Sequence, residues 1–299
     1  MEFRQFNDTC YAFYGPVNIG YVTQGEKGML IDAGIDKSTI KKVIKQLKNK
    51  QLPITHLFIT HAHSDHFGGA KYLQSEYDVY TIAPYLEEAI MRYPVLEPVY
   101  LFGGNEPLSE LRNKFIEGNP LRIDNVLTEG FHTIDNFSFD TYYLPGHSYY
   151  QLALRIHGVL YAADAYFSEE QLSKHKIPFL TDAEQAIESL NKIKQISCVG
   201  AIPGHGVYQK DFHTVVDANI NYHQKLLDWL EEKIASNPDG LTHETLVADM
   251  CEYYQVNPSQ LSQFLLFRTA VTSYLVALIK RDKVRSTIVK AKWIFYKKN

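Results

Sequence analysis

The chain has 299 residues, of which 45% are hydrophobic and 21% are charged, a composition typical of a globular protein. Its length predicts one large domain with a smaller one, and its net charge of −4 excludes a strong general attraction to nucleic acid. No stretch reaches about 18 uninterrupted apolar residues, so the sequence predicts no membrane span. The three cysteines, Cys10, Cys198 and Cys251, are widely spaced and odd in number, so we expect reduced thiols and a cytoplasmic location.

In chain order, short β-rich runs fill the first 32 residues, and residues 36–49 then carry a helical pattern. Short apolar strands are expected at 54–60 and 78–83. Strand patterns return between 121 and 164, a helix is expected at 182–194, and a last strand is expected at 198–203. This order favours two packed β-sheets with helices outside them.

Residues 84–120 differ from their surroundings because they mix helix-like pieces with prolines and five aromatic residues. We interpret this segment as an inserted cap of helices and loops. Ordinary core packing and an oligomer contact are the alternatives.

Residues 214–299 are predicted to form three helices followed by a β-hairpin, which is the winged-helix pattern. We therefore predict two domains, at 1–213 and 214–299. Residues 280–299 carry a net charge of +7, which leaves −11 for the rest. The last helix, 262–280, is mostly apolar, so we expect it to pack against the first domain or against a second subunit in a homodimer, and not against phosphates.

A dense group of histidines follows the expected strand at 54–60, in the sequence THAHSDHFGG. His61 and His63 are two residues apart on an extended segment, so both can hold one ion. The chain then turns, and Asp65 and His66 point toward a neighbouring ion. A zinc-type ion needs more than two protein ligands, so further ligands are expected downstream. The candidates at later strand ends are His147 in PGHS, Asp164 in YAADA and His205 in PGHG.

The series HAHSDH, PGH, AD and PGH, with LIDAG at 30–34, resembles the metallo-β-lactamase superfamily over about residues 1–213. The C-terminal part is similar to the winged helix that some β-lactamase-like hydrolases carry. The resemblance implies an α+β fold, in which an αββα sandwich with a two-metal site between its sheets precedes a small winged-helix domain.

The resemblance also implies a role for each ligand. The first ion would take His61, His63 and His147, and the second would take Asp65, His66 and His205. Asp164 would bridge both ions, and Asp32 would steady the histidine loop. All seven ligands offer nitrogen or oxygen, so Zn²⁺ is favoured and Mn²⁺ or Fe²⁺ remain alternatives.

The implied chemistry is hydrolysis, in which a hydroxide shared by the two ions attacks a carbonyl carbon or a phosphorus atom. Asp65 would hold or relay the proton, and Asp164 would fix the spacing of the ions, so these two residues are the predicted catalytic residues. We expect a small-molecule substrate, namely a thioester, a lactone or another ester.

Three alternatives remain open. One is a nuclease or phosphodiesterase, for which nucleic acid would be a partner. Another is a persulfide dioxygenase with a single iron on His61, His147 and Asp164. The third is a nucleic-acid-binding winged helix with a vestigial hydrolase.

The remaining histidines have no ligand spacing, and we expect them to be surface or satisfied core residues: His56, His132, His157, His175, His213, His223 and His243. Tyr149 and Tyr150 follow a predicted ligand. They would either line the substrate pocket or pack beneath the cap.

Overall fold

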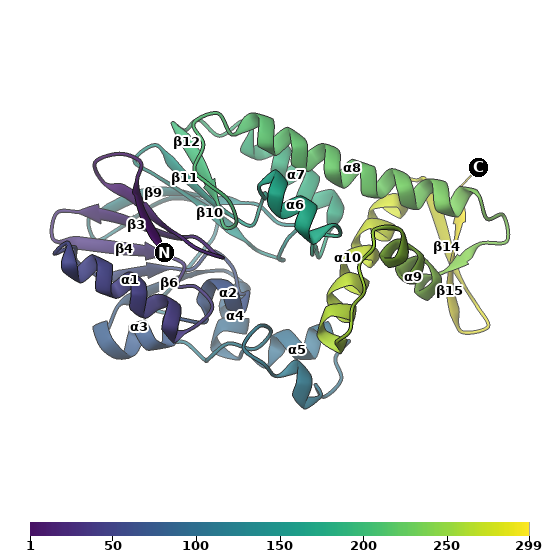
Figure 1. The fold of residues 1–299 in the computed structure, drawn as a ribbon, viewed down its shortest axis with the longest axis horizontal. Coiled ribbons are helices and arrows are strands. Elements are labelled where there is room, and N and C mark those ends of the chain that lie inside the picture. Colours follow the sequence, from purple (N-terminus) through teal and green to yellow (C-terminus); the bar gives the residue numbers. More distant parts are fainter. Residues whose placement is uncertain (299) are drawn as a thin grey trace.

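The computed structural model describes residues 1–298 and contains a β-sandwich flanked by helices, which leads into a helical C-terminal part (Figure 1). The first sheet has seven strands in chain order: β1 (Glu2–Gln5), β2 (Cys10–Tyr14), β3 (Ile19–Gln24), β4 (Lys27–Ile31), β5 (His56–Phe58), β6 (Tyr80–Pro84) and β7 (Asn125–Leu127). Its strands pair antiparallel from β1 to β4 and parallel from β4 to β7.

The second sheet has five strands in the order β12 (Gly200–Pro203), β11 (Val159–Ala163), β10 (Leu152–Ile156), β9 (Phe137–Tyr143) and β8 (Gly130–Ile134). Only the β11–β12 pair among them is parallel. Apolar side chains of both sheets meet between the layers, where Phe58 of β5 packs edge-on against Phe139 of β9. The two sheets are thus fixed against each other by a continuous apolar layer.

Helices cover the outer face of each sheet. On the first sheet lie α1 (Lys37–Asn49) and α3 (Ala70–Tyr77), and on the second sheet lie α7 (Ala183–Ile193) and the start of α8 (His213–Ala235). The short helices α2 (Ser64–Phe67) and α6 (Glu169–His175) follow the ends of β5 and β11. The Asp36 side chain caps α1 by accepting from the Thr39 amide at 3.0 Å. The predicted apolar face of this helix is buried, as its period of 3.6 residues requires.

The predicted cap contains α4 (Glu87–Arg92), α5 (Leu96–Leu101) and a 3₁₀ turn, η1 (Ser109–Leu111). Its apolar side chains Leu111 and Ile116 form a small core with Leu265. Leu265 belongs to the C-terminal part, so the cap packs against that part of the molecule.

The C-terminal part consists of α8, β13 (Leu241–Thr242), α9 (His243–Tyr253), α10 (Leu261–Lys280), β14 (Val284–Val289) and β15 (Lys292–Lys297). Its three strands pair antiparallel in the order β13-β15-β14. The three helices and the terminal hairpin occur as predicted. The narrower winged-helix assignment and the boundary between 213 and 214 stay predictions. The helix α8 begins at that boundary and packs into both parts, with Val216 in the sandwich core and Leu226 in the C-terminal core.

Helix α10 is the most apolar element of the C-terminal part, and its length and composition alone would allow it to cross a membrane. Its apolar side chains Ala270, Tyr274 and Leu278 instead share a core with α7, α8 and α9. At its end, Lys280 and Arg281 form salt bridges of 2.6 Å with Asp182 and Glu184 at the start of α7. The prediction that this helix packs against the first domain is therefore confirmed.

Candidate metal centre

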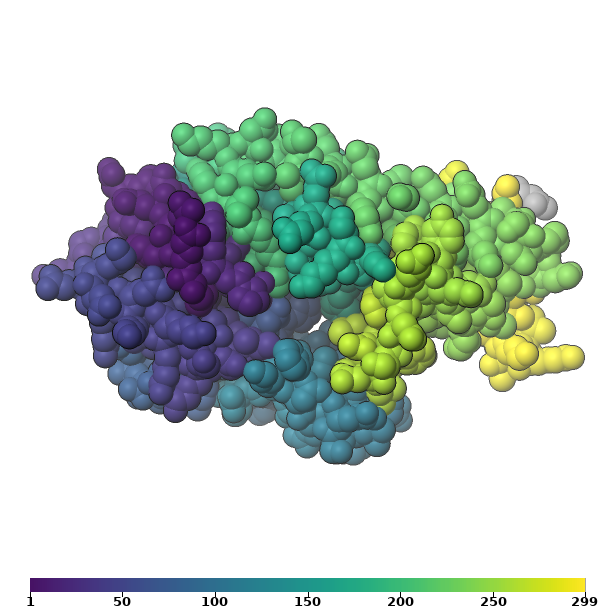
Figure 2. All heavy atoms as spheres, viewed as in Figure 1, coloured from purple at the N-terminus to yellow at the C-terminus, as the bar shows by residue number. Residues whose placement is uncertain are grey.

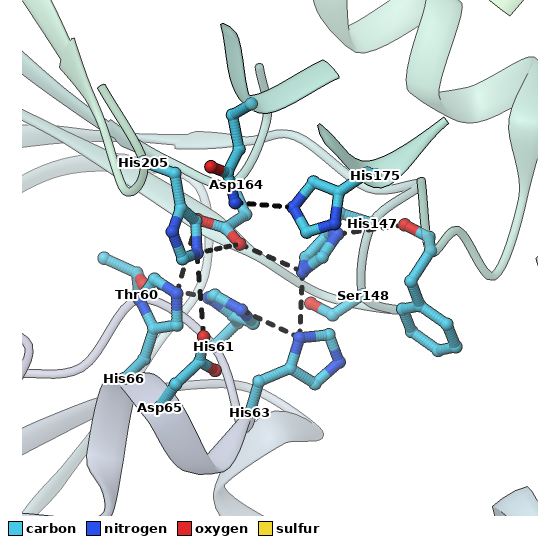
Figure 3. Close-up of polar contacts among 12 residues, drawn as sticks. Thr60, His61, His63, Asp65, His66, His147, Ser148, Asp164, His175 and His205 are labelled. Atoms are coloured by element: carbon cyan, nitrogen blue, oxygen red, sulfur yellow. Dashed lines mark hydrogen bonds and ion pairs between the residues drawn. The ribbon is translucent and has the colours of Figure 1, made fainter. Parts of the chain in front are cut away.

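The seven predicted ligands lie together at one end of the sandwich, between the two sheets (Figure 3). Each follows the end of a strand: β5 leads to the histidine turn and α2, β9 to His147, β11 to Asp164, and β12 to His205. Strand ends of both sheets meet here, so residues far apart in the sequence converge on one point.

The first group consists of His61, His63 and His147, whose ring nitrogens face one another. His61 Nε2 lies 3.0 Å from His63 Nδ1, which lies 2.9 Å from His147 Nε2. Burial lowers the pKa of all three rings, to about 4 for His63 and about 3 for His147. Three neutral imidazoles therefore direct nitrogen atoms at a common point, which is how they bind a divalent cation.

The second group consists of Asp65, His66 and His205, and it includes the two histidines that are held in the charged form. Burial by itself would lower the pKa of His205, but Asp164 and Asp65 outweigh it and raise this pKa to about 10. Burial would also lower the pKa of His66, but the carboxylates of Asp164 and Asp32 outweigh it and raise this pKa well above its ordinary value. Protons on these rings balance the buried carboxylates.

Asp164 lies between the two groups. Its Oδ1 is 3.3 Å from His66 Nε2, and its Oδ2 is 3.3 Å from His205 Nε2 and 3.4 Å from His147 Nε2. Burial would raise the pKa of Asp164, but His205 and His66 hold it well below its ordinary value. A carboxylate in this position can touch ions in both groups.

Asp32 fixes the histidine loop. Its carboxylate accepts from the Thr60 amide at 2.8 Å and from the Thr60 hydroxyl at 2.9 Å. It also lies 2.8 Å from Nδ1 of His66, so the opposite ring nitrogen, Nε2, faces Asp164. This contact confirms the steadying position that the resemblance implied for Asp32.

Backbone carbonyls orient two further rings. Nδ1 of His147 lies 3.1 Å from the Phe179 carbonyl, and Nδ1 of His205 lies 2.7 Å from the Pro16 carbonyl. Each contact uses one nitrogen as a donor and leaves Nε2 as the atom that faces the site, the arrangement usual for metal-binding histidines.

Two further observations indicate that these residues fit a metal ion. His66 Nε2 and Asp164 Oδ1 are buried and face each other at 3.3 Å, but neither makes a well-formed hydrogen bond, a costly state that a bound cation would relieve. Gly204 lies beside them, and a Cβ at this position would be 2.0 Å from Asp164 Oδ1. Glycine is thus required for the carboxylate to occupy this place.

A cleft of about 1010 Å³ opens from these ligands to the surface, and His63, Asp65, His147, Asp164 and His205 form its floor. The cap and the C-terminal part provide its outer walls. A cavity of this size is at the upper end of those that bind small molecules.

His175 also lines this cleft, a position that the sequence did not predict for it. It ends the short helix α6, and its ring centroid lies 6.4 Å from that of His205 (Figure 3). Burial lowers its pKa to about 4, so the ring is neutral, and its Nε2 is 2.8 Å from the Gln171 side chain. No sequence pattern identifies it, because a lone histidine on a seven-residue helix has no ligand spacing.

Glu87 of the cap is a second residue that the sequence did not reveal. Its buried carboxylate accepts from the Ala62 amide at 2.8 Å, the Ser148 hydroxyl at 2.9 Å and the Tyr150 amide at 2.7 Å. Ala62 and Ser148 are chain neighbours of predicted ligands. One carboxylate therefore joins the first histidine loop to the loop of His147.

The two tyrosines after His147 do not line the cleft. Tyr149 is 71% exposed, and Tyr150 packs against Tyr143 with ring centroids 4.5 Å apart. The expected packing against the cap is confirmed for Tyr150, whose ring centroid lies 5.5 Å from that of Tyr85 in the cap segment, and the expected pocket role is wrong for both tyrosines.

Comparison with known proteins assigns the family. The model of the metallo-beta-lactamase superfamily matches residues 13–205, and the chain belongs to this superfamily. The predicted α+β fold class is thereby confirmed.

Two solved structures share the fold over almost the whole chain, C-terminal part included. A beta-lactamase domain protein from Burkholderia ambifaria superposes with a TM-score of 0.76 at 16% identity, covering 99% of this chain and 94% of its own. A metallo-beta-lactamase family protein from Thermus thermophilus gives a TM-score of 0.71 at 15% identity, with 94% of each chain covered.

Curated relatives are also distant. Lactamase-like protein nscB from Aspergillus fumigatus is 24% identical over 206 residues, which are 69% of this chain and 52% of nscB. The atrochrysone carboxyl ACP thioesterase of the same organism is 21% identical over 218 residues, or 73% of this chain and 44% of the thioesterase. The chain thus spans about half the length of the curated relatives it matches.

Proposed function

We propose that this chain is a hydrolase that uses two divalent metal ions to cleave a thioester, with lactones and other esters as the alternative substrates. The observation that carries the proposal is the convergence of seven residues with nitrogen or oxygen ligand atoms, five of which line the floor of a cleft. A thioesterase among the relatives supports placing thioesters first.

The proposed first ion binds His61, His63 and His147, and the second binds Asp65, His66 and His205. Asp164, which approaches histidines of both groups, would contact both ions. Each set coincides with a group of side chains whose ligand atoms lie within 4.8 Å of one another, and a third such group, His61, His66 and Asp164, links them. Zn²⁺ is the favoured ion for these nitrogen and oxygen ligands, and Mn²⁺ and Fe²⁺ are the alternatives.

Ions bound there supply Lewis acidity and make water acidic enough to ionise near neutral pH. In the proposed reaction the water oxygen bonds to the acyl carbon, the carbon–sulfur bond breaks, and the leaving sulfur receives the proton. Asp65 is the proposed proton holder, since its carboxylate lines the cleft and lies 3.6 Å from His205 Nε2. Phe167 and Phe179 line the same cleft, with ring centroids 5.7 and 5.9 Å from that of His147.

The structure gives less support to a nuclease. The strands β14 and β15, whose sequence carries the basic residues, lie beyond α9 and α10 and away from α2 with its two ligands (Figure 1). The helix that would enter a DNA groove, α10, is built into the core. We therefore propose a small-molecule substrate and no nucleic-acid partner.

The free thiols of all three cysteines support a cytoplasmic location, which is part of the proposal.

Metal analysis combined with a substrate panel tests the function. Purified protein is remetallated with zinc, manganese or ferrous iron, and turnover is measured on a thioester, a lactone and a phosphodiester. We expect two ions per chain and a preference for the carbonyl substrates. A single ion that is always iron would overturn the two-metal proposal in favour of the persulfide dioxygenase, and a phosphodiester preference would favour the nuclease.

A further inference from the structure

The outer wall of the metal cleft is built by the C-terminal part. The turn at 255–258, between α9 and α10, contributes Val256 and Pro258 to the cleft, and the first turns of α10 contribute Leu266 and Phe267. We call these four residues the C-terminal wall. Lys176 holds this wall in place, because its Nζ donates to the Gln255 carbonyl at 3.0 Å.

Phe179 connects the C-terminal wall to the metal ligands. Its carbonyl orients His147, and its ring centroid lies 5.5 Å from that of His63 and 5.9 Å from that of His147. The same side chain packs with Leu266 against the small core of the cap and α10. Phe179 therefore places an apolar side chain between the ligand rings and the apolar core that α10 shares with the cap.

The apolar lining continues past the turn. A second cavity of about 620 Å³ lies between α9 and α10, and Val256 and Pro258 border both cavities. Most of its lining is apolar, including Val247, Cys251 and Phe264.

Two aromatic side chains at these openings are uncovered. Phe115 of the cap segment borders the metal cleft and is 67% exposed, and Phe264 borders the second cavity and is 40% exposed. Figure 2 shows the surface hollowed between the cap, in blue, and α10, in yellow-green. Exposed apolar surface around a hollow marks a binding site for an apolar group.

We infer that the cleft takes a thioester with a long unbranched acyl chain, which runs from the metal ligands past Phe179 and lies on the C-terminal wall. A small acyl group would fill only a fraction of the cleft. Each additional methylene that reaches the wall leaves water and gains binding free energy. This inference deepens the proposed function and rests on it for the thioester bond that is cleaved. The site that would bind the acyl chain, which we call the chain site, rests only on the apolar residues between the ligands and the C-terminal wall.

A chain-length series tests the inference. Thioesters of N-acetylcysteamine with acyl chains of four, eight and twelve carbons are compared in the parent, in Leu266→Trp and in Val256→Asn. The tryptophan narrows the path, and the asparagine places a polar group in it. The matched control is Ile288→Trp, at a position 66% exposed on β14, away from either cavity.

We expect kcat/KM of the parent to rise at least about tenfold from four to twelve carbons. Each cleft variant should lose about tenfold or more with the twelve-carbon substrate and stay within twofold of the parent with the four-carbon one. The control should follow the parent throughout. A flat series in the parent, or an equal loss for both chain lengths in the two variants, would overturn the inference.

Binding of fatty acids, measured by calorimetry, separates this inference from the proposed function. If no thioester is hydrolysed, but dodecanoate binds at least about tenfold more tightly than butanoate and Leu266→Trp removes that difference, the chain site holds and the thioesterase function fails. If hydrolysis occurs without any dependence on chain length in either assay, the function holds and the chain site fails.

Discussion

At the scale of single residues, Asp164 is the most demanding prediction, because its carboxylate approaches histidines of both proposed ion sites. Asp164→Ala should lose at least one ion and nearly all turnover, since two ions at short range need a shared anion to offset their repulsion. Elemental analysis and kcat report these losses. His157→Ala, on an exposed turn, should behave as the parent. Retention of both ions and full activity by the Asp164 variant would refute the bridge.

His175 allows a prediction of a different kind, since it borders the cleft without belonging to any of the three ligand groups. His175→Ala should keep two ions per chain and lower kcat/KM by about tenfold, the effect of one lost hydrogen bond to a substrate. His175→Gln should recover part of the loss because it keeps a polar atom there. A variant that loses metal instead would make His175 a ligand, contrary to this assignment.

At the scale of elements, α8 and α10 meet through a buried polar contact. His223 Nδ1 of α8 lies 2.8 Å from the Tyr274 hydroxyl of α10, and burial lowers the pKa of His223 to about 4 from its ordinary value of 6.5. Between pH 4 and 6.5 the unfolded chain therefore binds more protons at this site than the folded chain. The free energy of unfolding should fall as pH decreases through this window, by about 2 kcal/mol between pH 7 and pH 5 from this residue.

The test compares Tyr274→Phe with the double variant Tyr274→Phe and His223→Phe, so that no hydroxyl is left without a partner. Urea unfolding at pH 7 and pH 5 gives the two free energies for each protein. The double variant should show the smaller decrease, by about 2 kcal/mol. Equal decreases would mean that His223 does not titrate in this window.

The elements also show which parts of the site could be predicted. Four ligands form the compact motif HAHSDH and the other three follow later strand ends, so residue type and spacing predicted the ligands, and the resemblance that they carry implied the αββα sandwich. Glu87 and His175 lie on short helices of the cap and of the segment after β11, where no periodicity distinguishes them. Their positions depend on how these helices pack over the ligand loops, and a local sequence pattern does not contain that information.

At the scale of the whole molecule, removal of residues 218–299 should leave a poorly soluble protein. The deletion would uncover Ile177, Leu180 and Ala183, which now share a core with α8 and α10. We expect a lower soluble fraction and larger species in size-exclusion chromatography. The full-length variant with Lys290→Glu and Lys292→Glu should stay soluble, since Lys290 is exposed in the hairpin turn and Lys292 is exposed at the start of β15. A soluble, monomeric fragment with full activity would contradict the shared core.

The course of α8 has a consequence for proteolysis. The loop between β12 and α8 exposes Val207, Lys210 and Asp211, so a protease can cut it there. The cut would not release either half, because Val216 of α8 remains among the side chains of the sandwich while Leu226 and Leu230 remain in the C-terminal core. Nicked protein should therefore run as two bands on a denaturing gel and still migrate as one particle under native conditions.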